Sequence, residues 1–150
     1  MVKKLLGFAL LISLITPLPA TARAIWMREK TSDGSLLYVE TNYEPVSQSG
    51  WTVFKYGINK DGSLRENIGV TPYCTHGQVH RNERATRLQL PIPGWAETKD
   101  INRIRQISSI SNLSNFITAP GWIVVLDGKV TAIEANSPGS RSLLSVVCSY

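Results

Sequence analysis

The sequence predicts an α+β fold: an antiparallel β-sheet of about six to seven strands built from hairpins, covered by a C-terminal helix and joined by one disulfide. Three observations support this prediction. Asp-Gly pairs occur three times between stretches rich in β-branched and aromatic residues. A helix-start signature precedes an apolar stripe near the C-terminus, and the chain has only two cysteines, Cys74 and Cys148.

The N-terminal residues are typical of a secretory signal peptide. Two lysines precede an apolar run over residues 5–15, and the small residues of Ala22-Arg23-Ala24 predict cleavage after Ala24. The alternative is an uncleaved membrane anchor, but the run is much shorter than the about 20 apolar residues that span a bilayer. We therefore expect a signal peptide over residues 1–24 and a single α+β domain over residues 25–150.

Export determines both the location and the charge of the mature chain. The expected location is secreted, periplasmic or at the cell surface, with no stable membrane anchor after cleavage. Loss of the three basic residues Lys3, Lys4 and Arg23 lowers the formal net charge from +5 by three, to +2. Because binding of a phosphate backbone needs a concentrated excess of positive charge, the composition disfavours a nucleic-acid partner.

The three Asp-Gly pairs predict three hairpins, since this dipeptide favours a two-residue turn between strands. The expected hairpins join residues 25–31 to 36–42, residues 51–60 to 63–74, and residues 122–126 to 129–135. In the second hairpin, a two-residue turn places Val53 opposite Val70 and Lys55 opposite Ile68. One face of that hairpin is then aliphatic, and the other carries aromatic and polar side chains that include Tyr56.

The third hairpin has apolar residues on both faces of its first strand, where Trp122 and Val124 alternate with Ile123 and Val125. This pattern indicates a central strand that is covered on both sides. The C-terminal helix follows directly and could provide one of the two covers.

The segment between the second and third hairpins carries a weaker signal. Residues 85–90 favour a strand. Residues 98–116 carry an apolar residue at every third position, a spacing that circles a helix rather than following one side of it. We expect a short helix over residues 100–108, begun by Glu97 and Asp100 as caps, and then a Ser/Asn-rich loop. A triangular solenoid is the alternative, but a single run has no neighbouring turn to stack on.

The C-terminal helix is the most strongly marked element. Asn136 and Ser137 offer a capping side chain, and Pro138 stands where no N–H is required. A disulfide from Cys148 at the end of this helix to Cys74 would stabilise an exported fold by about 4–5 kcal/mol in the chain-entropy model. Free thiols are the competing interpretation.

Several of these residues also follow the pattern of a known family. The matching features are Trp26 at a strand start, the Asp33-Gly34 turn, the mid-chain Cys74, and the strings Leu37-Tyr38-Val39-Glu40, Gly50-Trp51-Thr52-Val53-Phe54-Lys55-Tyr56, Ser137-Pro138-Gly139-Ser140 and Leu143-Leu144 before Cys148. In this the chain resembles the surface-adhesin protein E-like family of small exported bacterial domains. The resemblance implies an antiparallel sheet with helical cover and an adhesive or binding role, and it carries over no catalytic residues.

The only cluster with metal-ligand character is Cys74, His76 and His80. These residues share one face of an extended strand, so a thiolate and two imidazoles could converge on copper or zinc. The same histidines could act as bases in a small hydrolase. Further ligands and a nucleophile motif are missing from the sequence, so we predict no cofactor and keep this metal or hydrolase site as the alternative function.

The candidate contact surface is basic and aromatic. Arg81, Arg84 and Arg87 stand against a single glutamate, and the planar guanidinium suits carboxylate or sugar-acid recognition. The alternative is a charged edge that prevents strand-to-strand aggregation. With Tyr56 and Arg65 these arginines form the predicted binding set of a non-enzymatic exported binding or adhesion-type domain. Its partner would be an unknown protein or an acidic glycan at the cell envelope, and an inhibitor or accessory subunit is a third possibility.

Overall fold

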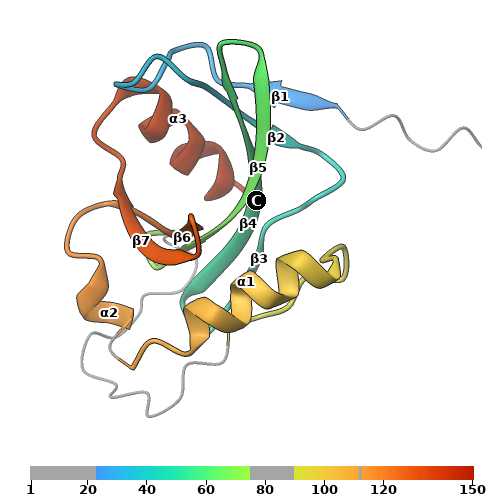
Figure 1. The fold of residues 1–150 in the computed structure, drawn as a ribbon, viewed down its shortest axis with the longest axis vertical. Coiled ribbons are helices and arrows are strands. Elements are labelled where there is room, and N and C mark those ends of the chain that lie inside the picture. Colours follow the sequence, from blue (N-terminus) through green and yellow to red (C-terminus); the bar gives the residue numbers. More distant parts are fainter. Residues whose placement is uncertain (1–22, 75–89, 112) are drawn as a thin grey trace, which may run out of the picture.

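The computed structural model describes residues 23–74, 90–111 and 113–150 (Figure 1). These residues form one sheet with helix α3 (Pro138–Val147) packed on one face and helix α1 (Thr98–Ser108) on the other. Among the described residues, no helix has both the length and the apolar character needed to cross a bilayer.

The sheet has seven antiparallel strands, which confirms the predicted fold class. The strand order is β1-β2-β4-β5-β6-β7, and β3 pairs with β4 beside this path. The remaining bounds are β1 (Ala24–Trp26), β2 (Leu36–Glu40), β3 (Val46–Gln48), β4 (Trp51–Lys60), β5 (Ser63–Thr71), α2 (Leu113–Phe116), β6 (Gly121–Leu126) and β7 (Lys129–Glu134).

Two of the three predicted hairpins form with the expected two-residue turns. In the β4–β5 hairpin, Val53 pairs with Val70 and Lys55 with Ile68, as predicted. In the β6–β7 hairpin, Leu126 pairs with Lys129. Both residues of each Asp-Gly pair have positive φ, with values of 52° and 82° in the first turn and 49° and 75° in the second. This is the conformation whose twist matches that of the flanking strands.

The first hairpin differs from the prediction. Strand β1 ends at Trp26, which pairs with Tyr38, so the connection to β2 is longer than two residues. The reason is local chemistry at Asp33, whose carboxylate accepts hydrogen bonds from the Thr31 hydroxyl and the Ser35 amide. These bonds favour a side-chain-stabilised loop over a tight hairpin turn, and only Gly34 of this pair has positive φ.

A fourth tight turn was not predicted. Ser49 and Gly50 both have positive φ, at 52° and 82°, and they join β3 to β4. Strand β3 is only three residues long, so its sequence shows too little alternation to mark a strand.

The two faces of the sheet bury different kinds of side chain, as the register predicted. Phe54, Tyr56 and Trp122 lie on the α3 face and pack with Leu143 and Val147 of that helix. The aliphatic face packs against α1, and its core includes Val53, Ile68, Val70, Ile104, Ile107 and Ile123. Strand β6 is therefore central and covered on both sides, one cover being α3 as expected.

The segment after the mid-chain gap agrees in part with the prediction. Helix α1 confirms the short helix, and it begins two residues earlier than expected, at Thr98. The predicted loop contains one turn of helix, α2, whose Leu113 is buried in the aliphatic core. The predicted strand over residues 85–90 lies outside the described residues except for Leu90, which is not in a strand.

Helix α3 begins as its sequence predicts. Ser137 is the N-cap, its side chain accepts a hydrogen bond from the Ser140 amide at 3.2 Å, and Pro138 follows. At the other end of the helix, Cys148 forms a disulfide with Cys74, and the two Cα atoms are 4.8 Å apart. The bond joins the end of α3 to the segment that follows β5, and it closes a separation of 74 residues.

The disulfide gives a first testable prediction. Replacing both cysteines with serine should lower the free energy of unfolding by about 4–5 kcal/mol, because the unfolded chain loses a long-range crosslink. Urea unfolding followed by circular dichroism measures this difference. The oxidised and reduced forms of the unmodified chain are the matched control, and equal stability of the two would contradict the prediction.

Candidate functional site

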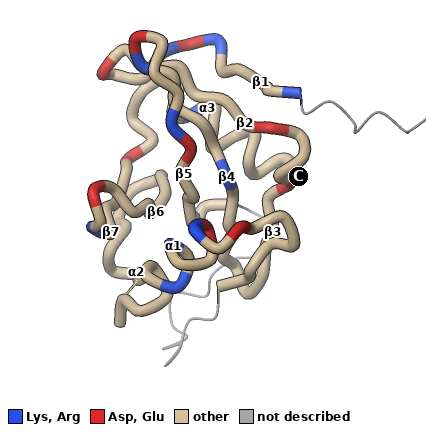
Figure 2. Tube along the Cα trace, turned by 45° about the vertical axis from the view of Figure 1, so that its right-hand side comes forward, with Lys and Arg blue, Asp and Glu red and all other residues tan. Residues whose placement is uncertain are grey.

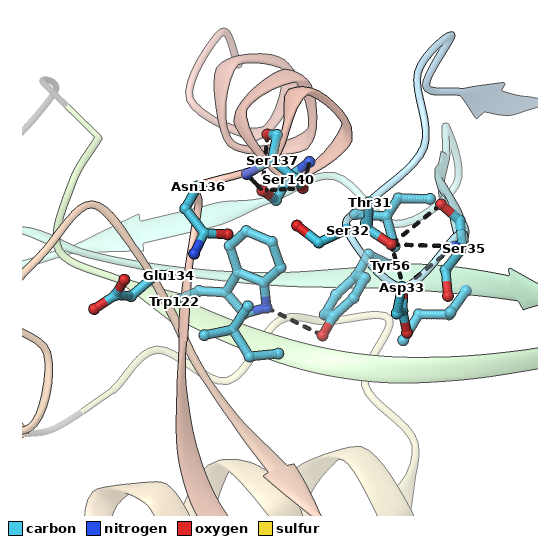
Figure 3. Close-up of a pocket in the computed structure, with 13 residues that line it drawn as sticks. Thr31, Ser32, Asp33, Ser35, Tyr56, Trp122, Glu134, Asn136, Ser137 and Ser140 are labelled. Atoms are coloured by element: carbon cyan, nitrogen blue, oxygen red, sulfur yellow. Dashed lines mark hydrogen bonds between the residues drawn. The ribbon is translucent and has the colours of Figure 1, made fainter.

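The aromatic face of the sheet carries a pocket of about 250 Å³ beneath the N-terminal end of α3 (Figure 3). We call it the α3 pocket. Its lining comes from the β1–β2 loop, β2, β4, β6, β7 and the start of α3. The lining residues are Thr31, Ser32, Asp33, Ser35, Leu37, Tyr56, Ile58, Trp122, Ile133, Glu134, Asn136, Ser137 and Ser140.

The floor of the α3 pocket is apolar because its polar atoms are used inside the protein. The Trp122 indole N–H donates a hydrogen bond to the Tyr56 hydroxyl at 3.0 Å, and both residues are buried. Burial raises the pKa of Tyr56 to about 12, and the hydrogen bonds with Trp122 and Asn67 oppose this rise only in part. Tyr56 is therefore uncharged at physiological pH and presents its ring, not a charge, to the pocket.

One side of the rim is the β1–β2 loop. The hydroxyls of Thr31 and Ser35 and the Ser35 amide lower the pKa of Asp33 to about 2, with a smaller contribution from Lys60. Asp33 is therefore a fixed negative charge at the rim.

The opposite side of the rim is the first turn of α3, whose backbone donors are already bonded. Gly139 N–H donates to the Lys30 carbonyl at 3.3 Å, and the Ser140 amide donates to the Ser137 hydroxyl. Pro138 has no N–H. This helix end therefore offers no free backbone donor to an anion.

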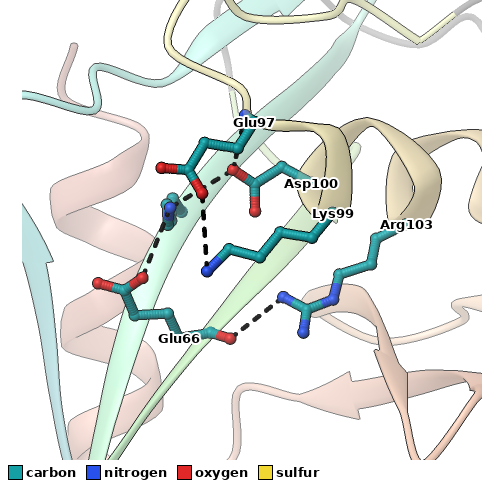
Figure 4. A network of polar contacts seen from close by, with 6 residues as sticks. Glu66, Glu97, Lys99, Asp100 and Arg103 are labelled. Carbon is teal, nitrogen blue, oxygen red and sulfur yellow. Dashed lines mark hydrogen bonds and ion pairs between the residues drawn. The ribbon is translucent and has the colours of Figure 1, made fainter.

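A second polar cluster lies on the other face of the sheet, where β4 and β5 meet α1 (Figure 4). The Lys55 ammonium is 3.4 Å from Asp100 and 3.5 Å from Glu66, and it lies 4.4 Å from the centre of the Tyr43 ring. Lys55 is 4% exposed and Asp100 is fully buried. Asp100 also accepts a hydrogen bond from the Glu97 amide, which confirms the predicted capping role of this acidic pair.

The charge state of this cluster favours a structural role. Burial opposes the charged form of Lys55, but the carboxylates of Asp100 and Glu66 outweigh it and raise its pKa above the ordinary value of 10.5. A catalytic lysine base needs the opposite shift. The cluster therefore fixes the start of α1 against β4 and keeps Lys55 in its charged form.

Strand β1 forms one edge of the sheet and is the third candidate. Ile25 and Trp26, adjacent on this strand, are 39% and 44% exposed. The Trp26 ring packs on Tyr38, with ring centres 4.5 Å apart. Lys and Arg are interspersed with Asp and Glu along the chain (Figure 2). This edge is therefore distinguished by its exposed apolar side chains and not by a patch of positive or negative charge.

The structure places two of the predicted binding residues and leaves the others outside the described part. Tyr56 is buried and lines the α3 pocket, so it is not on an exposed aromatic face. Arg65 is exposed on β5. Arg81, Arg84, Arg87, His76 and His80 lie outside the described residues, and their roles stay predictions.

Sequence reasoning missed the α3 pocket and the Lys55 cluster. The Asp33-Gly34 pair was interpreted as a turn alone, although Thr31, Asp33 and Ser35 together mark a side-chain-stabilised loop. Within the described residues, no group of three or more His, Cys, Asp or Glu side chains could hold a metal ion. Cys74 is in the disulfide and so does not supply the thiolate of the predicted metal site.

The comparisons with known proteins identify no relative. The chain matches no family model, no curated protein and no solved structure. The resemblance to the surface-adhesin protein E-like family therefore stays a prediction.

The Lys55 cluster gives a second prediction. Lys55→Met should lower the free energy of unfolding by about 3–5 kcal/mol, because it leaves the Asp100 carboxylate buried without its cation. Lys55→Met/Asp100→Asn should recover most of this loss, since asparagine keeps an acceptor for the Glu97 amide. Chemical unfolding measures both effects.

The control and the pH dependence make this prediction specific. Lys60→Met removes the exposed pair with Asp33, 3.6 Å apart, and should change stability little. Because the folded-state pKa of Lys55 is raised, the contribution of the pair is fully present below pH 10.5 and is lost only as the pH rises through the folded value. A double variant as unstable as Lys55→Met would show that the two side chains are not coupled.

Proposed function

We propose that the chain is an exported, non-enzymatic binding domain that contacts a partner protein through the edge strand β1. The observation that carries this proposal is the pair of adjacent, exposed apolar side chains on an edge strand. Extended partner segments bind such edges by adding a strand, with backbone hydrogen bonds for affinity and alternate side chains for specificity.

The backbone of β1 is suited to this contact. Thr41 N–H donates to the Arg23 carbonyl, and Met27 N–H donates to the Leu37 carbonyl, so the odd-numbered residues face β2. In an antiparallel ladder the alternate residues then turn their N–H and C=O groups outward. Ala24 and Trp26 thus offer two donors and two acceptors to an added strand.

Trp26 is positioned as an anchor for the partner. It packs on Tyr38, and the Tyr38 ring in turn lies over Gly57, where a Cβ atom would collide with it. The Trp26 ring is therefore supported before a partner arrives, which reduces the ordering cost of binding. Tryptophan is also among the residues that contribute most to interface affinity.

Export is part of the proposal, and the disulfide supports it because structural disulfides persist in oxidising compartments. The cleavage position matters for β1. Cleavage after Ala24 would remove Arg23 and Ala24, which both pair with β2. Cleavage after Ala22 would keep the whole strand, and Ala20-Thr21-Ala22 also supplies small residues at the required positions.

The N-terminus of the exported chain therefore gives a third prediction. In place of the start at Ile25 that the sequence alone predicts, we expect the mature protein to begin at Arg23, because this start keeps the Arg23–Thr41 hydrogen bonds. Intact-mass measurement of protein exported by the native host distinguishes this start from Ile25. A mature chain that begins at Ile25 would lack half of the outward β1 backbone groups, and would argue against binding at this edge.

The alternative functions depend on residues outside the described part. A small hydrolase or metal-dependent enzyme would use His76 and His80, and an acidic glycan would be bound by Arg81, Arg84 and Arg87. The β1 edge favours a protein partner over a glycan, since backbone pairing requires a second polypeptide.

Site-specific photo-crosslinking tests the proposed function. A photo-reactive amino acid at position 26 should give one discrete crosslinked partner in the native host, whereas the same group at Leu64 should not. Leu64 is a matched control because it is also apolar and 60% exposed, but lies on β5.

The backbone contribution is tested with Ala24 substitutions in the position-26 crosslinking protein. Ala24→Pro removes an outward N–H that the fold does not use, and edge strands tolerate proline. It should abolish the crosslink, whereas Ala24→Val should keep it. Equal crosslinking from positions 26 and 64, or a crosslink that survives Ala24→Pro, would contradict strand addition at β1.

A further inference from the structure

We propose that the α3 pocket is a binding site for a small amphiphile that has an apolar body and a hydrogen-bond-donating head group. The pocket lies between the sheet and the start of α3, so this inference goes beyond the β1 contact and does not depend on it. Three properties of the lining carry it: the size of the pocket, the chemistry of the floor and the chemistry of the rim.

The size of the pocket sets the size of the ligand. A dry cavity of about 150 Å³ in another protein holds a benzene molecule. The α3 pocket, at about 250 Å³, therefore has room for a bicyclic ring with a short side arm.

The floor selects an apolar body. Leu37, Ile58 and Ile133 line it together with the Tyr56 and Trp122 rings. The indole N–H of Trp122 is already bonded to the Tyr56 hydroxyl, so a polar group placed on the floor would lose its hydrogen bonds to water. The Tyr56 and Trp122 rings are each only 2% exposed, so the half-buried Ile58 and Ile133 side chains form most of the accessible floor, and this apolar surface favours an apolar body.

The rim of the pocket favours a ligand head group that donates hydrogen bonds over one that is an anion. Asp33 is ionised down to a pH of about 2 and supplies the negative charge of the rim, whereas the Glu134 side chain points away from the pocket (Figure 3). A carboxylate only accepts hydrogen bonds, and the first turn of α3 has no free backbone donor. The Ser32 hydroxyl and the Asn136 amide also line the pocket and can both donate and accept, so the Asp33 carboxylate decides the charge preference of the rim.

The cations near the rim do not reverse this preference. Lys60 lies 3.6 Å from Asp33, and the Arg141 guanidinium donates to the Asn136 carbonyl at 2.9 Å. Both cations therefore already have acceptors. Because the Lys60–Asp33 pair is exposed, water screens it, and Asp33 can still accept a hydrogen bond from a ligand head group. An ammonium or hydroxyl head group can donate to the rim, whereas a carboxylate head group would meet like charge.

A matched ligand series tests the proposal. Tryptamine, tryptophol and indole-3-acetate share the indole ring and differ in the head group, which is an ammonium, a hydroxyl and a carboxylate. We expect tryptamine and tryptophol to shift the NMR signal of the Trp122 indole N–H on titration, and indole-3-acetate to bind about tenfold or more weakly.

Variants of the disulfide-bonded mature protein locate the binding. Ile133→Trp fills the pocket from β7 and should weaken tryptamine binding by about tenfold or more. Ser32 is exposed at the rim, so Ser32→Trp should block the pocket entrance without disturbing the core. This variant tests whether tryptamine binds in the pocket if Ile133→Trp does not fold. Leu126→Trp is the matched control, since it adds the same bulk to exposed Leu126, outside the pocket, and should leave binding unchanged.

Each outcome of this experiment is informative. Binding of all three ligands below detection would overturn the site itself. Binding of indole-3-acetate as tight as that of tryptamine would overturn the head-group assignment. Binding that survives both pocket-blocking variants would place the ligand elsewhere on the protein.

Discussion

The double burial of β4, β5 and β6 is the constraint on which the rest of the structure depends. Val53 and Phe54 are neighbours on β4 with side chains on opposite faces, and both are fully buried. The same is true of Trp122 and Ile123 on β6. A sheet with two apolar faces is stable in water only when both faces are covered, so this chain needs two helices on opposite sides.

The two covering helices are held in different ways. Helix α3 is fastened at its C-terminal end by the disulfide to Cys74 and is capped at its start by Ser137. Helix α1 is held at its start by the Lys55–Asp100 ion pair, which crosses from the sheet into the first turn of the helix. The disulfide depends on redox conditions and the ion pair does not, so the two covers are held by interactions that respond to different conditions.

Local chemistry was predictable from the sequence, and long-range pairing was not. The Asp61-Gly62 and Asp127-Gly128 turns fixed the strand registers correctly, because a two-residue turn leaves one choice of pairing. The same dipeptide at Asp33 predicted the wrong register for β1 and β2, because the Thr31 hydroxyl and the Ser35 amide donate hydrogen bonds to the Asp33 carboxylate and form a longer loop. Lys55 was placed opposite Ile68, but its partner Asp100 is 45 residues away and no sequence pattern links them.

In the candidate sites too, single residues and strands could be predicted from the sequence, but their arrangement in space could not. Tyr56 was singled out from the sequence as a contact residue, and the structure places it in the floor of a pocket whose other walls come from β2, β6, β7 and α3. A pocket assembled from four separate stretches of the chain, residues 31–37, 56–58, 122 and 133–140, has no continuous sequence signature. The β1 edge was easier to anticipate as a strand, but its exposure depends on the strand order of the whole sheet.

The supporting glycines connect the fold to both proposed contacts. The Phe54 ring lies over Gly69 and the Tyr38 ring over Gly57, and a Cβ atom at either glycine would collide with the ring. Phe54 in turn contacts Tyr56 and Trp122, which form the pocket floor, while Tyr38 supports Trp26 on β1. A ring packed this closely against the backbone has little room to move. Both surfaces are therefore set by the folding of the sheet itself, and a partner or ligand needs to order little of the protein when it binds.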